Sequence, residues 1–314
     1  MPEFKSSDGL RLHYTDEGEG PAILCLSGLT RNSSDFDYVI PYLTGHRIIA
    51  LDYRGRGQSQ WAKDWESYTI PTEARDVLEL MAHLGLEEVA ILGTSRGGLI
   101  AMALAATVPG KLTGVCLNDI GPELAPEGLE VIQDYIGKNP SQKTYDEAVA
   151  MRAKLLPGFE GVSEARWREE VEKHYVETDE GLQINYDPKL ADAVAAVGAQ
   201  PVPDLWPLFD ALKPLPTALI RGANSNLLTA ETAAKMQARH PEMIYAEVPD
   251  RGHVPFHPQQ SNGTQQLRRC NPQHQPLMRN IGNVDLLVIR LQRHPSSFVQ
   301  YLNLSMTWDC LLQY

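Results

Sequence analysis

The sequence contains few cysteines, and these are widely scattered. Only four occur among its 314 residues. Single cysteines match neither the paired spacing of a zinc site nor the disulfide framework of a small secreted protein. Because Cys25 and Cys116 fall within apolar runs, we expect them to be reduced thiols of the core, and we expect no metal ion and no cofactor.

Long apolar runs, a secretion signal and clusters of positive charge are also missing. No stretch approaches the roughly 20 apolar residues that cross a bilayer, and the N-terminus has neither the basic nor the apolar region of a signal peptide. A net charge of -12 opposes binding to nucleic acid and to anionic lipid. We therefore expect a cytoplasmic protein with small-molecule partners, and no nucleic-acid or membrane partner.

Residues 1–121 alternate short apolar runs with helical periods. This alternation is typical of βαβ units that build a mainly parallel sheet. A hairpin that turns at Asp8 and Gly9 is expected first. The expected strands are 22–28, 47–53, 89–95 and 112–119, and the expected helices are 72–84 and 95–108. Since these strands are almost wholly apolar, we expect both faces of the sheet to be covered.

The pattern changes between residues 122 and 212. Helical periods dominate there and no strand-like run is found. Strands are expected again at 216–222 and 243–250, with a helix at 229–239 between them. We therefore predict one α/β core, formed by residues 1–121 and 213–258, that is interrupted by a helical cap at 122–212.

The composition changes again after Pro258. Residues 259–314 contain no Ala, Glu or Lys, and five Arg against two Asp give them a charge of +3. The segment is too rich in aromatic residues for an ordinary low-complexity tail. Our hypothesis is that a reading-frame shift or a cloning junction replaced the native C-terminus here. Sequencing the source gene tests this, because one continuous frame in related isolates would contradict it.

Ser95 lies at the centre of the motif GTSRG, between an expected strand and an expected helix. At such a junction, glycines permit the strained turn that lifts a serine Oγ above the edge of the sheet. The N-terminus of the following helix offers N–H groups and a positive dipole to a developing oxyanion. The simpler alternative is that Ser95 only caps the helix.

His253 is the best candidate for the base that a nucleophilic serine needs. It follows the last apolar strand in the glycine-flanked loop "DRGHVPF". The other histidines lie on strands, turns or helix surfaces, in the insertion, or in the C-terminal segment. The order serine, acid, histidine along the chain also fits.

Four ordered motifs make residues 1–257 resemble the α/β-hydrolase family. They are "LSGLT" (26–30), "LDYRGRGQS" (51–59), "GTSRGG" (93–98) and "GHVP" (252–255). The resemblance implies a mostly parallel eight-stranded sheet flanked by helices, with a cap after the sixth strand. It also implies hydrolysis through an acyl-enzyme on Ser95, with an oxyanion hole made by the backbone N–H groups of Leu29 and Arg96.

The sequence offers more than one candidate for the acid that would hold the His253 imidazole. The resemblance places it after the seventh strand, where this sequence has Asn226 in the turn "RGANSNLL". An amide can accept the imidazole N–H, but it cannot stabilise an imidazolium by charge. Asp119, at the end of the sixth strand, is the alternative acid, because the two strand ends lie close together in such a sheet. A third interpretation is that Asn226 was introduced to trap a substrate.

Three further residues are candidates for substrate binding. Arg96 follows the nucleophile and is placed to meet a substrate carboxylate, although a buried arginine more often has a protein partner. Trp167 and Trp206 offer apolar walls, although packing within the cap explains them as well.

The favoured function is hydrolysis of small or medium carboxylic esters or lactones, in the manner of a carboxylesterase. One alternative with the same machinery is a carbon–carbon bond hydrolase of ring-cleavage products. Another is a weakly active or non-catalytic binding protein, which the amide at Asn226 favours. Dehalogenase chemistry is disfavoured, because its nucleophile is a carboxylate.

Overall fold

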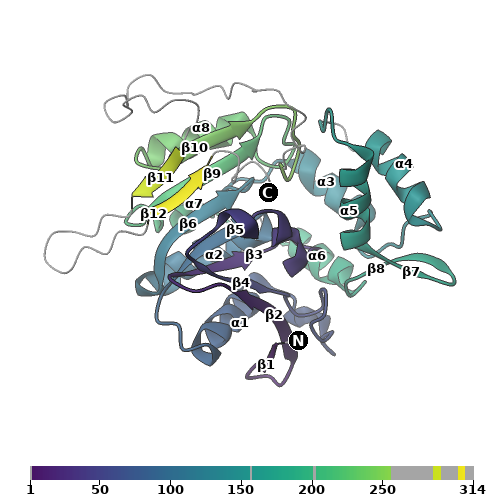
Figure 1. Ribbon diagram of the computed structural model, residues 1–314, viewed down its shortest axis with the longest axis horizontal. Helices are drawn as coiled ribbons and strands as arrows, with labels where there is room; N and C mark the ends of the chain where they lie inside the picture. Colours follow the sequence, from purple (N-terminus) through teal and green to yellow (C-terminus); the bar gives the residue numbers. More distant parts are fainter. Residues whose placement is uncertain (1, 156–157, 201–202, 256–285, 291–302, 308–314) are drawn as a thin grey trace, which may run out of the picture.

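An eight-stranded sheet organises the chain in the computed structural model, which describes residues 2–155, 158–200, 203–255, 286–290 and 303–307. The strand order is β1-β2-β4-β3-β5-β6-β9-β10. Strands β1 and β2 run antiparallel to their neighbours. The other six strands, β4, β3, β5, β6, β9 and β10, run parallel to one another. The predicted α/β fold class is therefore confirmed (Figure 1).

The strands of this sheet are β1 (Glu3–Lys5), β2 (Arg11–Glu17), β3 (Ala22–Leu26), β4 (Arg47–Leu51), β5 (Val89–Thr94), β6 (Leu112–Asn118), β9 (Thr217–Gly222) and β10 (Ile244–Val248). The helices are α1 (Ile70–His83), α2 (Arg96–Thr107), α3 (Pro126–Tyr135), α4 (Tyr145–Leu155), α5 (Glu164–His174), α6 (Leu190–Gly198), α7 (Trp206–Asp210) and α8 (Ala230–Arg239), with short 3₁₀ turns η1 (Ser33–Tyr38), η2 (Ile40–Tyr42), η3 (Trp65–Ser67) and η4 (Pro109–Lys111). Each strand and helix expected from the sequence is present, shortened or shifted by one to three residues.

The sheet separates two apolar clusters, because successive strand residues point to opposite faces. On β3, Leu24 and Leu26 pack with residues of α1, α2, α7 and α8. The alternate residues of the strand, Ile23 and Cys25, pack on the other face with Phe36 of η1 and its neighbours. This explains why the strands read as continuous apolar runs.

The two cysteines of the described sheet are free thiols, as expected. Cys25 and Cys116 are both buried, without a disulfide. Burial raises the pKa of the Cys116 thiol to about 12, so it stays protonated at neutral pH. Cys270 and Cys310 lie outside the described residues.

The segment between β6 and β9, residues 122–212, contains α3 to α7 and also a two-stranded hairpin. The hairpin pairs β7 (Tyr175–Thr178) with β8 (Gly181–Ile184). Its strands were not predicted because each has only four residues, too few to show a periodic pattern. In Figure 1, α3, α4 and α5 lie to one side of the sheet, with α6 and this hairpin below them. We call residues 122–212 the insertion.

The C-terminal segment contributes one described feature. Strand β11 (Leu286–Arg290) pairs antiparallel with β12 (Asn303–Thr307). The rest of residues 259–314 lies outside the described residues, and the hypothesis of a replaced C-terminus stays a prediction. None of the helices in the described ranges is long and apolar enough to span a bilayer.

Candidate active site

Ser95 occupies a sharp turn between β5 and α2. Its φ of 49° lies in the left-handed region that non-glycine residues rarely adopt. Two neighbouring glycines make the turn possible. A Cβ on Gly97 would lie 2.1 Å from the carbonyl oxygen of Leu26, and one on Gly98 would lie 2.3 Å from the Cγ2 of Ile120. The glycines of the motif therefore let α2 begin directly against the sheet.

The Ser95 hydroxyl is directed at a histidine. Within the described part of the chain, its side chain makes no capping hydrogen bond to α2. Instead its Oγ lies 3.1 Å from the Nε2 of His253. The structure thus brings together the predicted nucleophile and the predicted base, which are 158 residues apart in the sequence.

Asp119 contacts the other ring nitrogen of His253. Its Oδ2 lies 2.7 Å from the Nδ1 of His253. The carboxylate is fully buried and also accepts hydrogen bonds from the backbone N–H of Gly222 at 2.9 Å and from the Ser225 hydroxyl at 2.7 Å. Asp119 has a φ of 55°, a conformation that aspartate tolerates better than most residues. These contacts fix the carboxylate against the ring.

Asn226 does not occupy the position of the acid, which corrects the placement that the resemblance implied. Its side chain is exposed, and its backbone carbonyl faces Gly128 of α3. The physical reason is that β6 and β9 are neighbours, so the carboxylate of Asp119 at the end of β6 already fills the space beside His253. The amide at Asn226 therefore leaves the His253 contacts intact.

Ser225 is a site residue that the sequence analysis missed. Its hydroxyl donates to Asp119 and accepts from the backbone N–H groups of Leu227 and Leu228, at 3.3 and 3.1 Å. It thus joins the turn after β9 to the carboxylate after β6. The sequence did contain a signal for this role, because the hydroxyl of a serine in a turn often forms hydrogen bonds with the neighbouring backbone.

We expect Ser225→Ala to lower kcat/KM for ester substrates about 10-fold, because a buried carboxylate loses one charge-assisted hydrogen bond. Asn226→Ala, one position further along and exposed, is the matched control and should keep the rate of the unmodified chain. Steady-state kinetics on both variants measures the difference. Equal rates for the two variants would contradict the role of Ser225.

The loop after β3 lies beside the nucleophile. A Cβ on Gly28 would be 3.9 Å from the Cβ of Ser95. Among the described residues, no acceptor is bonded to the backbone N–H of Leu29 or to that of Arg96 at the start of α2. Both N–H groups can therefore donate to a bound ligand, and their role as oxyanion donors stays a prediction.

A buried ion cluster connects these two donors. Arg56 donates from Nε to the Leu29 carbonyl at 2.9 Å and from Nη1 to Glu73 at 2.8 Å. Arg96 donates from Nε to the other oxygen of Glu73 at 2.5 Å and from Nη2 to the Tyr68 carbonyl at 3.1 Å. Burial alone would raise the pKa of Glu73, but the two guanidinium groups hold it below its ordinary value. The Arg96 side chain is thus held by α1, which does not support its predicted role in substrate binding.

Glu73→Gln should lower the free energy of unfolding by about 3 kcal/mol, since it leaves two buried guanidinium groups without their shared counter-ion. Urea denaturation measures this value. The matched control is Glu130→Gln on the exposed surface of α3, for which a change within about 0.5 kcal/mol is expected. Similar values for both variants would show that the cluster contributes little to stability.

The two tryptophans have packing partners. Trp167 is 3% exposed, in a cluster with Val149 of α4. Trp206 donates from its indole nitrogen to Glu123 at 2.9 Å and packs edge-to-face against Phe209. These contacts explain both side chains, and their predicted role as walls of a substrate pocket stays a prediction.

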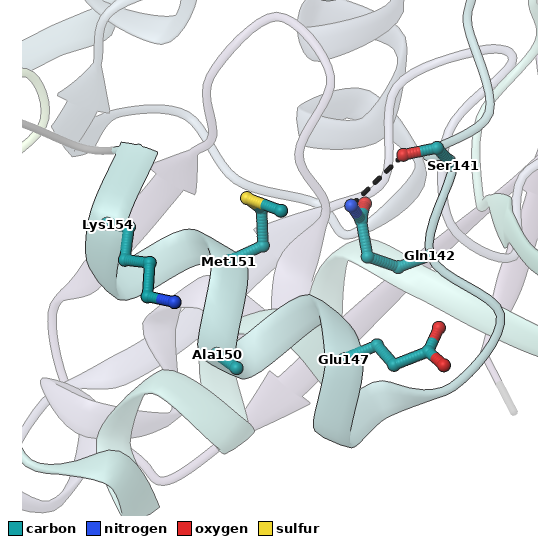
Figure 2. A pocket seen from close by; sticks show the side chains of 6 residues that line it. All are labelled: Ser141, Gln142, Glu147, Ala150, Met151 and Lys154. Carbon is teal, nitrogen blue, oxygen red and sulfur yellow. Dashed lines mark hydrogen bonds between the residues drawn. The ribbon is translucent and has the colours of Figure 1, made fainter.

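A separate hollow of about 350 Å³ lies along α4, as Figure 2 shows. It is lined by Ser141, Gln142, Glu147, Ala150, Met151 and Lys154. None of these residues belongs to the Ser95–His253–Asp119 chain, so this hollow is not the candidate site. Within the described ranges, no group of three or more His, Cys, Asp or Glu side chains is arranged to hold a metal ion.

Comparisons with known proteins agree with the geometry. Residues 21–259 match the α/β hydrolase fold family. The chain is 38% identical to the 3-hydroxybutyrate-oligomer hydrolase of Cupriavidus necator, covering 78% of this chain and 87% of that protein. It is 27% identical to the 2-(acetamidomethylene)succinate hydrolase of Mesorhizobium japonicum, covering 78% and 85%.

A solved structure supports the same assignment. The crystal structure of an α/β hydrolase from Novosphingobium aromaticivorans has a TM-score of 0.75 at 39% identity, covering 81% of this chain and 91% of that one. With the sheet order and the Ser95–His253–Asp119 geometry, these matches show that the chain belongs to the α/β hydrolase fold family.

Proposed function

We propose that this hydrolase cleaves carboxylic esters through an acyl-enzyme on Ser95. The observation that carries the proposal is one continuous hydrogen-bonded chain. The Nε2 of His253 lies 3.1 Å from the Ser95 Oγ, and its Nδ1 lies 2.7 Å from the Asp119 Oδ2. This is the arrangement in which a serine hydroxyl becomes a nucleophile.

In the proposed mechanism, each group has a role in the first half of the reaction. His253 removes the Ser95 proton as Oγ attacks the ester carbonyl, and Asp119 stabilises the imidazolium that forms. The carbonyl oxygen becomes negatively charged and accepts hydrogen bonds from the N–H groups of Leu29 and Arg96. His253 then donates its proton to the departing alcohol, which leaves the acyl group on Ser95.

Water completes the cycle. His253 takes a proton from a water molecule as that molecule attacks the acyl carbonyl, and the collapse of the second tetrahedral intermediate releases the acid. The proton returns to Ser95. Each proton that His253 accepts is returned within one turnover, so the proposal needs neither a metal ion nor a redox cofactor.

The substrates that we propose are small esters of hydroxy acids. The support is the 38% identical relative, whose name describes the hydrolysis of 3-hydroxybutyrate oligomers. The binding-protein interpretation rested on the amide of Asn226, and the contact between His253 and Asp119 removes that reason. Hydrolysis of a carbon–carbon bond would use the same three side chains, so the choice of substrate distinguishes it from ester hydrolysis.

One assay distinguishes these functions. The purified chain is given the 3-hydroxybutyrate dimer, a 4-nitrophenyl ester and a vinylogous diketone of the ring-cleavage type. We expect turnover of the dimer and of the 4-nitrophenyl ester. Turnover of the diketone alone would replace the ester proposal by carbon–carbon hydrolysis, and inertness towards all three would reject both.

A further inference from the structure

A basic cluster lies on the loop that approaches Ser95. The stem of Arg31 packs on Gly28, since a Cβ at Gly28 would lie 3.3 Å from the Cγ of Arg31 and 3.9 Å from the Cβ of Ser95. The Arg31 Nη1 lies 2.6 Å from the Nε2 of His174, which ends α5. Arg152 of α4 reaches the same nitrogen with its Nη2 at 3.4 Å. Two arginines from distant parts of the chain therefore converge on His174, and the stem of Arg31 packs on the loop beside Ser95.

The hydrogen bonds determine the charge state of His174. Its Nδ1 lies 3.1 Å from the backbone carbonyl of Glu170. A carbonyl only accepts and a guanidinium only donates, so the proton is on Nδ1 and Nε2 is the acceptor. His174 is neutral in this arrangement, and it orients the two arginines without compensating their charge.

The arginines of the cluster differ in their counter-ions. Arg31 forms ion pairs with Asp35 and Glu170, and Glu170 also pairs with Arg166 at 2.7 Å. Among the described residues, no carboxylate forms an ion pair with Arg152. Its Nε is buried and has no hydrogen-bond partner in the described protein. Glu170 attracts Arg152 electrostatically without a direct ion pair, and it is already paired with Arg31 and Arg166.

Arg152 is on the inner face of α4. It follows Ala148 by four residues and Val149 by three, and both are 5% exposed in the cluster with α5. Figure 2 shows Glu147, Ala150, Met151 and Lys154 around the hollow on another side of the same helix. The position of Arg152 is therefore not that of a solvated surface arginine.

Solvent reaches the neighbourhood of Arg152. Tyr135, at the end of α3, interacts with Thr30 of the loop after β3 and with Arg152, yet its side chain is 45% exposed. Tyr135 therefore gives the neighbourhood of Arg152 a side that is open to solvent.

We propose that Arg152, oriented by His174, binds a carboxylate of the substrate. This inference rests on the proposed ester hydrolysis and narrows it to esters that carry a free carboxylate away from the scissile bond. A carboxylate matches the planar donors of a guanidinium and supplies the direct ion pair that Arg152 does not form with any described residue. Arg152 is then a specificity-determining residue, and it takes no part in bond cleavage.

The test compares the 3-hydroxybutyrate dimer with the same dimer whose terminal carboxylate is converted to a primary amide. Arg152→Gln should lower kcat/KM for the carboxylate dimer by about 10- to 100-fold, the effect of one hydrogen bond to a charged group. The amide dimer should change by less than about threefold, and Arg152→Lys should recover part of the loss. Equal losses for both dimers, or no loss for either, would overturn the proposal.

A matched control comes from the same insertion. Arg168 of α5 is 41% exposed and pairs with Glu172 and Asp146, so Arg168→Gln should leave the preference for the carboxylate dimer unchanged. Thermal unfolding of both variants shows whether they are folded. A loss of preference in Arg168→Gln as large as in Arg152→Gln would assign the effect to general charge and reject the specific site.

A binding measurement separates this inference from the proposed function. Calorimetry with the Ser95→Ala chain reports the Kd of each dimer without turnover. If the unmodified chain hydrolyses neither dimer while Ser95→Ala binds the carboxylate dimer about 10-fold more tightly than the amide, and Arg152→Gln removes the difference, the hydrolysis proposal fails and the carboxylate site stands. Equal Kd values for the two dimers would reject the site.

Discussion

Ser95→Ala is expected to lower kcat for ester hydrolysis by about 10⁶-fold, the effect of removing a serine nucleophile that acts as one unit with its base. Among the described serines, only Ser95 has its Oγ hydrogen-bonded to the Nε2 of His253, and the strained turn at φ 49° directs it there. Burst and steady-state kinetics with a 4-nitrophenyl ester measure the change.

The matched control for this variant is Ser141→Ala, an exposed serine of the insertion. It should keep full activity. A Ser95→Ala chain that retains more than about a hundredth of the activity would contradict covalent catalysis on Ser95, and it would direct attention to a mechanism in which His253 activates water directly.

Asp119→Asn is expected to lower kcat by about 10⁴-fold, equivalent to about 5.5 kcal/mol of transition-state stabilisation. The amide keeps the size of the side chain, but it removes the charge that stabilises the His253 imidazolium and permits the wrong tautomer. Because Asp119 is fully buried with three hydrogen-bond partners, thermal unfolding must accompany the kinetics to show that the variant is folded.

Asn226→Asp is the counterpart of that substitution. Its side chain is exposed and lies away from the bonded pair of His253 and Asp119, so a new carboxylate there should change kcat by less than about threefold. A gain of several orders of magnitude would mean that the chain lacks a working acid and that position 226 is its natural site.

The fold was predictable because its strands are buried on both faces. The runs of β3 and β5 are apolar at almost every position, and turn residues bound them, so their type and order are evident from the sequence. The hairpin of β7 and β8 was not predicted, because strands of four partly exposed residues show no such apolar pattern.

The positions of the proposed nucleophile and the proposed base were predictable for a different reason. Each lies in a loop whose glycines mark an unusual backbone, directly after an apolar strand. The acid was not predictable to one residue, because the ends of β6 and β9 are neighbours in the sheet and either can supply a carboxylate to His253. The choice of Asp119 follows from the direction of its side chain, which no sequence pattern encodes.

The contacts that support the candidate site could not be predicted from the sequence, for a similar reason. Glu73 looks like an ordinary polar residue in the first turn of α1, yet it is fully buried between Arg56 and Arg96. Arg152 and Arg31 are 121 residues apart in the sequence, and both contact His174. Contacts of this kind depend on how the insertion packs on the core, which periodicity does not specify.

The most direct test of the account is the mass of the chain after treatment with a fluorophosphonate, followed by peptide mapping. We predict a single adduct, on the peptide that contains Ser95, and much slower labelling in Asp119→Asn at unchanged folding. Labelling of a different residue, or the absence of any adduct in a chain that still hydrolyses esters, would contradict the claim that Ser95 is the nucleophile activated by His253 and Asp119.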